Sequence, residues 1–411
     1  MSFEILSKKV FETFSQKVAY KSFMQSSQMA ELFKKRGYSI AYVGLRADGD
    51  LQVAALVYSI PMTGGLHMEI NSGPFSTDTK YLSDFYRGLQ DYAKNEGALE
   101  LLVKPYDTYQ TFDSDGNPID DERPELIKTL TDLGFVHDGL QTGYPGGEPD
   151  WHYVKDMREI TADNLMKSLS KKGRPLVKKS KTFGTKLKKL SREELTLFKE
   201  ITSSTSDRRD YTDKGLDYYQ AFYDSWGDQA EFMIASLNFQ DYADHLKDSQ
   251  AKLQAKLDKL AQTHAKNLES SKYLRQKKEL DQQVATFDKR LEEAQELLDH
   301  HGHQDVILAG SLFVYTKQEA IYLFSGSYTE FNKFYAPALL QEHVMLGTIK
   351  RGIPSYNFLG IEGIFDGSDG VLRFKQNFNG YITRKMGTFR YYPSPLKFKA
   401  LKTIKKVLGR Q

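Results

Sequence analysis

The chain has 411 residues, no cysteine and a formal net charge of +3. Its length predicts two or three domains, and a hydrophobic share of 40% is enough to build packed cores. The lack of cysteine excludes disulfides, thiolate metal sites and a cysteine nucleophile. The opening segment lacks the apolar core of a signal peptide, and no stretch approaches the roughly 18 apolar residues that span a bilayer. We therefore expect a cytoplasmic protein that does not cross the membrane.

The N-terminal third alternates strand-like and helix-like segments. Residues 54–61 and 67–74 have the composition of strands. Residues 81–96 carry apolar side chains at helical spacing and are followed by the stop signal Gly97. Residues 99–105 return as a strand. This order predicts a strand–strand–helix–strand unit.

The same order recurs late in the chain. Residues 309–316 and 320–327 are strand-like, 334–351 is helical, and 355–361 is the closing strand. The two copies lie about 255 residues apart, and their landmarks agree within two residues. Similarity at a fixed offset indicates a duplicated unit, and each copy is expected to be a mixed sheet flanked by helices.

Between the copies lies a charged segment with helical periodicity. Residues 241–301 contain neither proline nor glycine, and their leucines recur mostly at intervals of three, four or seven residues. The pattern breaks near residues 267–273, which predicts two helices of about 27 residues each, about 40 Å long. Because the break supplies both partners within one chain, an antiparallel hairpin arm is favoured over a dimerising rod.

Two blocks of positive charge stand out from the near-neutral total. Residues 171–189 hold nine Lys or Arg and no acid, and residues 370–411 hold eleven and no acid. Such blocks favour local anionic partners, which could be nucleic acid, sugar phosphates or anionic lipid. A solvated basic surface is the plain alternative for either block.

Familiar catalytic and metal motifs are missing. The sequence has no Walker loop, GxSxG elbow or HExxH. His300, His301 and His303 cluster at the expected end of a helix, where histidine is electrostatically suited, so neither a metal site nor a cofactor is predicted. The acidic loop 366–369 with Glu362 lacks calcium-loop spacing, which favours turn chemistry.

The segment 370–378, GVLRFKQNF, follows a glycine-rich loop. Strand alternation would place Leu372 and Phe374 on one face and Arg373 and Lys375 on the other. A lysine in such a strand is usually a surface residue, so the pattern alone does not indicate catalysis.

Two segments carry a specific resemblance. Residues 356–363 (YNFLGIEG) and 370–378 resemble the C-terminal signature of the Fem/MurM–MurN (FemABX) aminoacyltransferases. Further similarity lies at GFVHDGL (134–140), FQDYADHL (239–246) and Ala336-Pro337. The order of parts also agrees, and the likeness covers nearly the whole chain. The sequence is most similar to the MurN side of the family.

The resemblance implies an α+β fold with two GNAT-like domains and an inserted coiled-coil arm similar to that of seryl-tRNA synthetases. The expected first GNAT-like domain is residues 1–152, and the second is residues 153–240 together with 302–392. The coiled-coil arm between its two parts is residues 241–301, and the basic C-terminal tail or helix is residues 393–411.

The resemblance also implies an activity. Members move an amino acid from aminoacyl-tRNA onto an amine of a peptidoglycan precursor, either lipid II or a UDP-linked muropeptide. The expected donor is alanine, with serine or glycine as alternatives. No cofactor and no obligate protein partner are expected.

Family roles carry over to individual residues. The lysine of the FK pair, Lys375, is implicated in proton transfer, and Phe374 lines the reaction site. A lysine after the Gln25-Ser26-Ser27 segment binds the acceptor in relatives. The acceptor-binding residues expected here are Lys34 or Lys35, Lys214, Tyr218, Arg208 and Arg209.

Two departures blur acceptor specificity. Relatives often have Asp-Pro where this chain has Lys104-Pro105, and many have tyrosine where it has Phe324. At the diphosphate position Lys214 replaces an arginine, which keeps the charge but loses the bidentate fork.

The basic block suits contact with the tRNA backbone, which would make affinity fall with salt. The expected contacts are Lys171, Lys172, Arg174, Lys178, Lys179 and Lys181. In the tail, Leu396, Leu401, Ile404 and Leu408 recur near helical spacing among six cations. That pattern fits either an interfacial helix on anionic lipid or a cap on the first domain.

The chemistry needs no nucleophilic side chain, because an aminoacyl ester is already activated. A partly buried lysine could relay a proton from the amine to the ribose oxygen, and Lys375 is the candidate. Two rival functions are an acetyl-CoA-dependent GNAT acetyltransferase and a non-catalytic RNA-binding protein. The first would need a glycine-rich pyrophosphate loop opening a helix, and neither Gly73 nor Gly326 is followed by another glycine.

Overall fold

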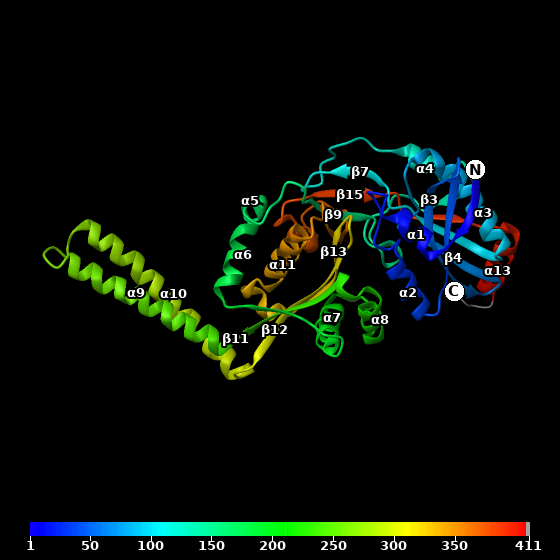
Figure 1. Cartoon of the computed structure of the whole chain (residues 1–411). Helices are drawn as coiled ribbons and strands as arrows, with labels where there is room; N and C mark the ends of the chain where they lie inside the picture. The colour runs from blue at the N-terminus through cyan, green and yellow to red at the C-terminus, as the bar shows by residue number, and fades with distance from the viewer. Residues whose placement is uncertain (210, 408–411) are drawn as a thin grey trace.

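A computed structural model describes residues 1–209 and 211–407. Two mixed β-sheets form the body, and a long helical arm projects from the second (Figure 1). Within the described residues, no helix is long and apolar enough to cross a membrane.

The first sheet has the strand order β1-β2-β3-β4-β6-β16-β8, with β5 paired to β3. Alternate residues of β3 face opposite cores, so that Ala54 and Leu56 pack under α1 and α2, while Val53 and Val57 pack under α3. The elements of this part are β1 (Ser2–Leu6), α1 (Lys8–Ser15), α2 (Ser27–Lys35), β2 (Ser39–Ala47), β3 (Asp50–Met62), β4 (Gly65–Asn71), β5 (Phe75–Ser76), α3 (Leu82–Asn95), β6 (Ala98–Lys104), α4 (Pro124–Thr131), β8 (Val136–His137) and β16 (Phe389–Tyr391).

The second sheet has the order β10-β11-β12-β13-β14-β9-β15-β7. Helices α7 and α8 cover one face, and α6 and α11 cover the other. The elements are β7 (Thr108–Phe112), β9 (Trp151–Asp156), α5 (Leu165–Ser168), α6 (Gly173–Thr182), β10 (Lys186–Lys189), α7 (Leu195–Arg209), α8 (Leu216–Trp226), β11 (Ala230–Asn238), β12 (Asp305–Tyr315), β13 (Ala320–Ser327), α11 (Ala336–Lys350), β14 (Ser355–Ile361), α12 (Gly370–Gln376) and β15 (Tyr381–Lys385).

The predicted duplication is confirmed by topology. In the first sheet β3 and β4 are antiparallel, α3 follows, and β6 then pairs parallel to β4. In the second sheet β12 and β13 are antiparallel, α11 follows, and β14 pairs parallel to β13. Each parallel pair needs a crossover connection, and the helix supplies it.

The two halves exchange strands. β7, from within the range expected for the first domain, pairs with β15 of the second sheet, whereas the late strand β16 pairs with β6 of the first. A single apolar core also joins α1 and α2 to α7 and α8. The sheets therefore do not follow the contiguous ranges 1–152 and 302–392, and the halves are tied together by both backbone pairing and packing.

The arm is an antiparallel pair of helices, as the periodicity predicts. α9 (Phe239–Thr263) and α10 (Ser271–His301) pack along each other, and their apolar seam includes Leu253 and Tyr273. α10 ends at Gly302, which adopts a positive φ of 73°. In Figure 1 the arm leaves the body beside β11 and β12 and points away from the first sheet.

The C-terminal helix α13 (Pro395–Val407) lies against the first half. A side chain at Gly64 would collide with Leu401, and the ring of Phe398 packs on Tyr392. Leu396 and Ile404 are exposed. Leu408, the last apolar residue of the predicted helical pattern, lies outside the described residues.

Candidate active site

A cleft of about 880 Å³ lies between the two halves. Its walls come from α2 and the edge of the first sheet on one side, and from α7, β12, β13, β14 and α12 on the other. Its lining includes Arg36, His67, Glu69, Asn71, Tyr106, Glu148, His152, Arg208, Arg209, Lys214, Tyr218, Phe358, Leu359, Gly360, Phe374 and Lys375.

The segment that carries Phe374 and Lys375 is a helix, not the predicted strand. Asp369 begins α12 by accepting hydrogen bonds from the backbone N–H groups of Val371 (2.7 Å) and Leu372 (3.1 Å). Alternation of apolar and charged side chains over a few residues resembled a strand. The N-cap at Asp369 instead begins a short helix. The predicted turn chemistry of the acidic loop is confirmed by Asp369 and by Asp366, which accepts from Ser368.

Lys375 is buried, with 3% of its surface exposed, yet it lines the cleft. Its Nζ donates to the carbonyl oxygens of Leu359 (3.1 Å) and Gly360 (2.5 Å). Burial lowers the pKa of Lys375 to about 7, although the charge of Asp369 partly opposes the shift. Two N–H bonds to fixed carbonyls leave the third position on the nitrogen for a lone pair or a proton. The amine can therefore change protonation near neutral pH.

Phe374 lies beside it on α12 and also lines the cleft. Its ring packs edge-on against Phe378 at 5.3 Å between centroids. This contact fixes an apolar surface in the cleft that Lys375 also lines.

A buried polar network, which the sequence did not reveal, shapes the carbonyls that receive Lys375. Leu359 has a positive φ of 56°, and its N–H donates to Asn357 Oδ1 at 2.8 Å. Asn357 Nδ2 in turn donates to Glu319 Oε2 (3.0 Å) and to the hydroxyl of Tyr106 (3.1 Å). Burial raises the pKa of Glu319. Asn357 stands within the YNFLGIEG motif, and only that position hinted at a role.

His152 stands in the floor of the same region. Its Nδ1 lies 3.3 Å from Asn357 Nδ2, and its Nε2 lies 3.3 Å from the carbonyl of Pro149. Burial lowers the pKa of His152 well below its usual range, and the nearby charges of Lys385 and Lys375 lower it further. The ring is therefore neutral, and its Nε2 donates to the Pro149 carbonyl.

Cations gather on another side of the cleft. Arg208, Arg209, Lys214 and Tyr218 all line it, as expected for the acceptor site. The Tyr218 ring has Lys214 Nζ 5.7 Å and the Arg36 guanidinium 5.2 Å from its centre. Burial raises the pKa of Tyr218 to about 12. Its hydroxyl therefore stays protonated as a donor at neutral pH.

Lys34 and Lys35 do not line the cleft. Lys34 Nζ lies 3.5 Å from Glu31, and Lys35 Nζ lies 3.9 Å from Asp224. Both end α2, and the next residue, Arg36, faces the cleft instead. The shift of one residue follows from helical geometry, since successive side chains on a helix point about 100° apart.

The Gln25-Ser26 segment holds α2 in place. Gln25 is buried and bridges two strands, accepting from the Leu56 N–H (2.7 Å) and donating to the Asn71 carbonyl (2.7 Å). Ser26 caps α2 by accepting from the Met29 N–H. The QS segment therefore sets the position from which Arg36 reaches the cleft.

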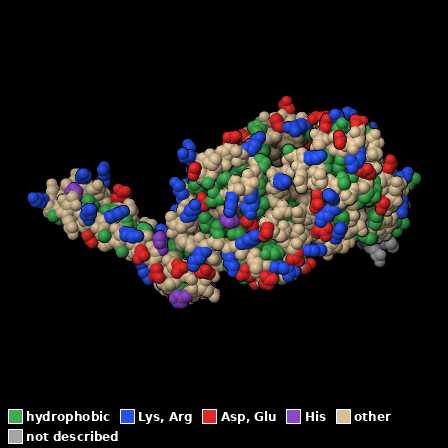
Figure 2. Space-filling model, viewed as in Figure 1, with side chains coloured by type: hydrophobic (Ala, Val, Ile, Leu, Met, Phe, Trp, Pro, Cys, Tyr) green, Lys and Arg blue, Asp and Glu red, His purple; other side chains and the backbone are tan. Residues whose placement is uncertain are grey.

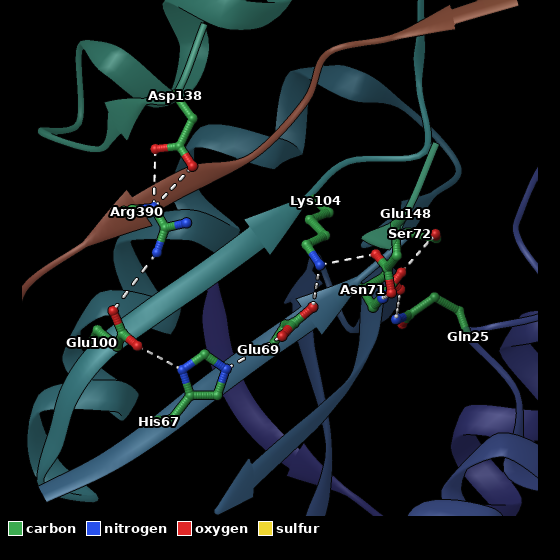
Figure 3. Close-up of polar contacts among 10 residues, drawn as sticks. All are labelled: Gln25, His67, Glu69, Asn71, Ser72, Glu100, Lys104, Asp138, Glu148 and Arg390. Atoms are coloured by element: carbon green, nitrogen blue, oxygen red, sulfur yellow. Dashed lines mark hydrogen bonds and ion pairs between the residues drawn. The ribbon is translucent and has the colours of Figure 1, made fainter. Parts of the chain in front are cut away.

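An acidic network forms the wall on the first sheet (Figure 3). His67 bridges Glu100 (2.8 Å) and Glu69 (3.3 Å), and these hydrogen bonds raise the pKa of His67 to about 9. Burial on its own raises the pKa of Glu69, but His67 and Lys104 outweigh it and hold that pKa at about 2. Lys104 Nζ lies 2.8 Å from Glu148. Lys104 Nζ also lies 3.0 Å from Glu69, so this lysine holds two carboxylates.

The basic block lies outside the cleft, on α6 and the turn before it. Exposed here are Lys171, Lys172, Lys178, Lys179 and Lys181. Arg174 instead donates to the carbonyls of Lys167 and Leu169, and Lys181 also pairs with Glu342 at 2.7 Å. Figure 2 shows Lys and Arg side chains along this edge of the body and along the arm.

Among the described residues, no group of three or more His, Asp or Glu side chains is arranged to hold a metal ion. The His300–His303 cluster instead closes α10, where the His301 ring packs near Phe239 and Phe331.

Known proteins match this chain over nearly its whole length. The FemAB family model matches residues 6–406. The aminoacyltransferase FemA of Staphylococcus aureus (strain bovine RF122 / ET3-1) is 28% identical over 419 residues, with 100% of both chains covered. A crystal structure of FemX superposes with a TM-score of 0.75 at 20% identity, covering 98% of this chain and 100% of that one.

A tandem GNAT protein from the clavulanic acid biosynthesis pathway superposes with a TM-score of 0.50 at 8% identity, covering 96% of this chain and 99% of that one. These likenesses confirm the predicted fold of two GNAT-like domains. The match over residues 6–406 shows that the chain belongs to the FemAB family and is an aminoacyltransferase.

Proposed function

We propose that this chain transfers an amino acid from aminoacyl-tRNA to a primary amine of a peptidoglycan precursor, building its interpeptide bridge. The observation that carries the proposal is Lys375, an amine with a pKa lowered to about 7 at the wall of a cleft shared by both halves. The cations that also line this cleft suit a phosphate-bearing acceptor.

In this reaction the acceptor nitrogen attacks the ester carbonyl of the charged tRNA, forming a C–N bond. The C–O bond to the ribose breaks, and one proton must travel from the nitrogen to the ribose oxygen. Neutral Lys375 takes the proton and then returns it to the leaving oxygen. Phe374 and Phe358 keep the region apolar, which strengthens these polar interactions.

The acceptor's diphosphate is proposed to bind Arg36, Lys214 and the Tyr218 hydroxyl, with Arg208 and Arg209 nearby. Lys34 and Lys35 are better read as surface residues, because each already faces a carboxylate. Whether the acceptor is lipid-linked or nucleotide-linked is decided by assaying both.

The tRNA is proposed to contact Lys171, Lys172, Lys178, Lys179 and Lys181, with Arg174 bracing the turn. Support comes from the junction between this block and α12, where the Ser170 N–H donates to the Asn377 carbonyl at 3.2 Å. Reversing Lys178 and Lys179 to Glu should weaken tRNA affinity and flatten its salt dependence. The same change at exposed Lys317 is the control. An unchanged salt slope would remove the assignment.

Helix α13 is proposed to touch anionic lipid, which would bring the enzyme to a lipid-linked acceptor at the inner membrane face. Its exposed Leu396 and Ile404 lie among lysines. Flotation with vesicles of phosphatidylglycerol and phosphatidylcholine should carry the protein upward, and the variant Leu396→Asp should reduce this. Equal flotation of the protein with vesicles of pure phosphatidylcholine would contradict the proposal.

The deciding experiment for the function is mass spectrometry of the acceptor after incubation with mixed charged tRNAs. An added alanine mass is expected first, with serine and glycine as the alternatives. Addition of an acetyl group from acetyl-CoA, or tRNA binding without any change in the acceptor, would overturn the proposal.

A further inference from the structure

A second buried lysine, Lys155 on β9, contacts the turn that follows α12. It is 3% exposed, and its Nζ donates to the carbonyls of Phe378 (2.9 Å), Asn379 (2.9 Å) and Ser168 (3.2 Å). Burial lowers the pKa of Lys155 to about 8, with the charge of Asp156 opposing the shift. Asp156 itself is engaged by Arg158. The ammonium is thus held by backbone oxygens alone.

Two of these carbonyls belong to the turn that ends α12. The N–H of Phe378 donates to the carbonyl of Lys375 (3.0 Å), and the N–H of Asn379 donates to that of Gln376 (3.2 Å). Asn379 has a positive φ of 56°, the left-handed conformation that asparagine adopts more readily than most residues at the end of a helix. The bonds from Lys155 hold the carbonyls of Phe378 and Asn379, on both sides of this residue, and so fix the turn.

The third carbonyl connects the same ammonium to the basic block. Ser168 ends α5, and Asn379 Nδ2 also donates to its carbonyl (3.3 Å). Gly173, the first residue of α6, packs so closely that an added Cβ would lie 1.9 Å from the Asn377 carbonyl oxygen. The end of α12 and the start of the block therefore share one packed junction with Lys155 at its centre.

We propose that Lys155 is a positioning residue for acyl transfer. Its bonds to the carbonyls of Phe378, Asn379 and Ser168 fix the end of α12. The fixed helix end in turn keeps the Lys375 nitrogen bonded to the carbonyls of Leu359 and Gly360. The role rests on the proposed function of Lys375. Lys375 lines the cleft, whereas Lys155 is not among its lining residues, so Lys155 is assigned a positioning role and not contact with the substrate.

The test compares Lys155→Met with the wild type in three measurements. The variant is expected to lower kcat about tenfold or more while the KM for the acceptor stays within about threefold, because binding groups are untouched. The acidic limb of the kcat profile should move to higher pH as Lys375 becomes hydrated. Acetylation of Lys375 by an N-hydroxysuccinimide ester, followed by peptide mass spectrometry, should accelerate once the rate is divided by the fraction of neutral amine at each pH, because the nitrogen becomes more accessible.

Controls separate positioning from general destabilisation. Thr348→Val removes a buried hydroxyl that donates to the Val344 carbonyl at 2.7 Å, far in sequence from α12, and should lower stability without changing Lys375 acetylation. Lys155→Gln, which keeps N–H donors without the charge, should give intermediate protection and serves if Lys155→Met does not fold. The labelling readout does not depend on activity, so it stands even if Lys375 proves not to relay a proton. Unchanged Lys375 acetylation and an unchanged pH midpoint in the Lys155 variants would overturn the proposal.

Discussion

The Nζ of Lys375 lies 3.1 Å from the carbonyl oxygen of Leu359, the residue that holds a left-handed backbone conformation in β14. The side chain of Lys375 on α12 therefore bonds to the backbone of β14 at the residue where that strand departs from extended geometry. The pairing places an amine with a pKa near 7 at the cleft without any carboxylate in hydrogen-bond contact.

The burial of Lys375 should make the free energy of unfolding depend on pH. The folded pKa of Lys375, about 7, lies below its ordinary value of 10.5, so the unfolded chain binds the proton more tightly. The destabilisation is complete below pH 7 and is relieved as pH rises towards 10.5. Lys375→Met should therefore stabilise the protein more at pH 6.5 than at pH 10 in urea unfolding. A difference that does not depend on pH would contradict the lowered pKa.

Asn357 should matter for both folding and turnover. Asn357→Leu removes the acceptor for the Leu359 N–H and the donor to Glu319, and leaving such buried groups unpaired should lower the free energy of unfolding by about 1–3 kcal/mol each. Turnover should fall as the carbonyls that hold Lys375 move. Asn95→Leu, at an exposed helix end, is the control. Equal stability of the two variants would rule out the network.

Arg36, rather than Lys34, should set affinity for the acceptor. Arg36→Gln removes a guanidinium from the cleft and should raise the acceptor KM about tenfold, the loss expected for a charged hydrogen bond. Lys34→Gln is the matched control and should leave KM nearly unchanged, because Lys34 faces Glu31. Steady-state kinetics with each variant decide between the two residues. A larger effect at Lys34 would restore the assignment that the family resemblance implied.

His67 should give a stability effect of the opposite sign. Its folded pKa of about 9 lies above the ordinary 6.5, so its bonds to Glu100 and Glu69 stabilise fully below pH 6.5 and are lost as pH rises through 9. His67→Gln should therefore destabilise the fold at pH 6 and much less at pH 9.5. The exposed His303→Gln serves as the comparison. An equal loss at both pH values would show that packing, not charge, is the contribution of His67.

Local periodicity predicted much of the fold. The strands and helices of the two copies and the arm follow from patterns within short windows, and the order of these elements, repeated about 255 residues later, indicated the duplication. The exchange of β7 and β16 could not be read in this way, because strand pairing across about 280 residues leaves no local trace. α12 was misread because seven residues are too few to separate a helix from an alternating strand.

The site was predictable in part. Resemblance led to Lys375, Phe374, Lys214, Tyr218, Arg208 and Arg209, and all six line the cleft. The Asn357–Glu319–Tyr106 network could not be predicted, because its members lie on different elements and meet only after folding. Arg36 was missed because a one-residue difference in spacing turns a helix-end side chain to another side.

The central claim is that Lys375 relays the proton during acyl transfer. The most direct measurement is the single-turnover rate of amide formation by wild type and Lys375→Met, with saturating charged tRNA and precursor, from pH 6 to pH 9. The wild-type rate should rise to a plateau above the Lys375 pKa of about 7. The variant should be slower by about 100-fold or more at the plateau while still binding both substrates. A variant rate within about threefold of the wild type, at full substrate binding, would contradict the mechanism.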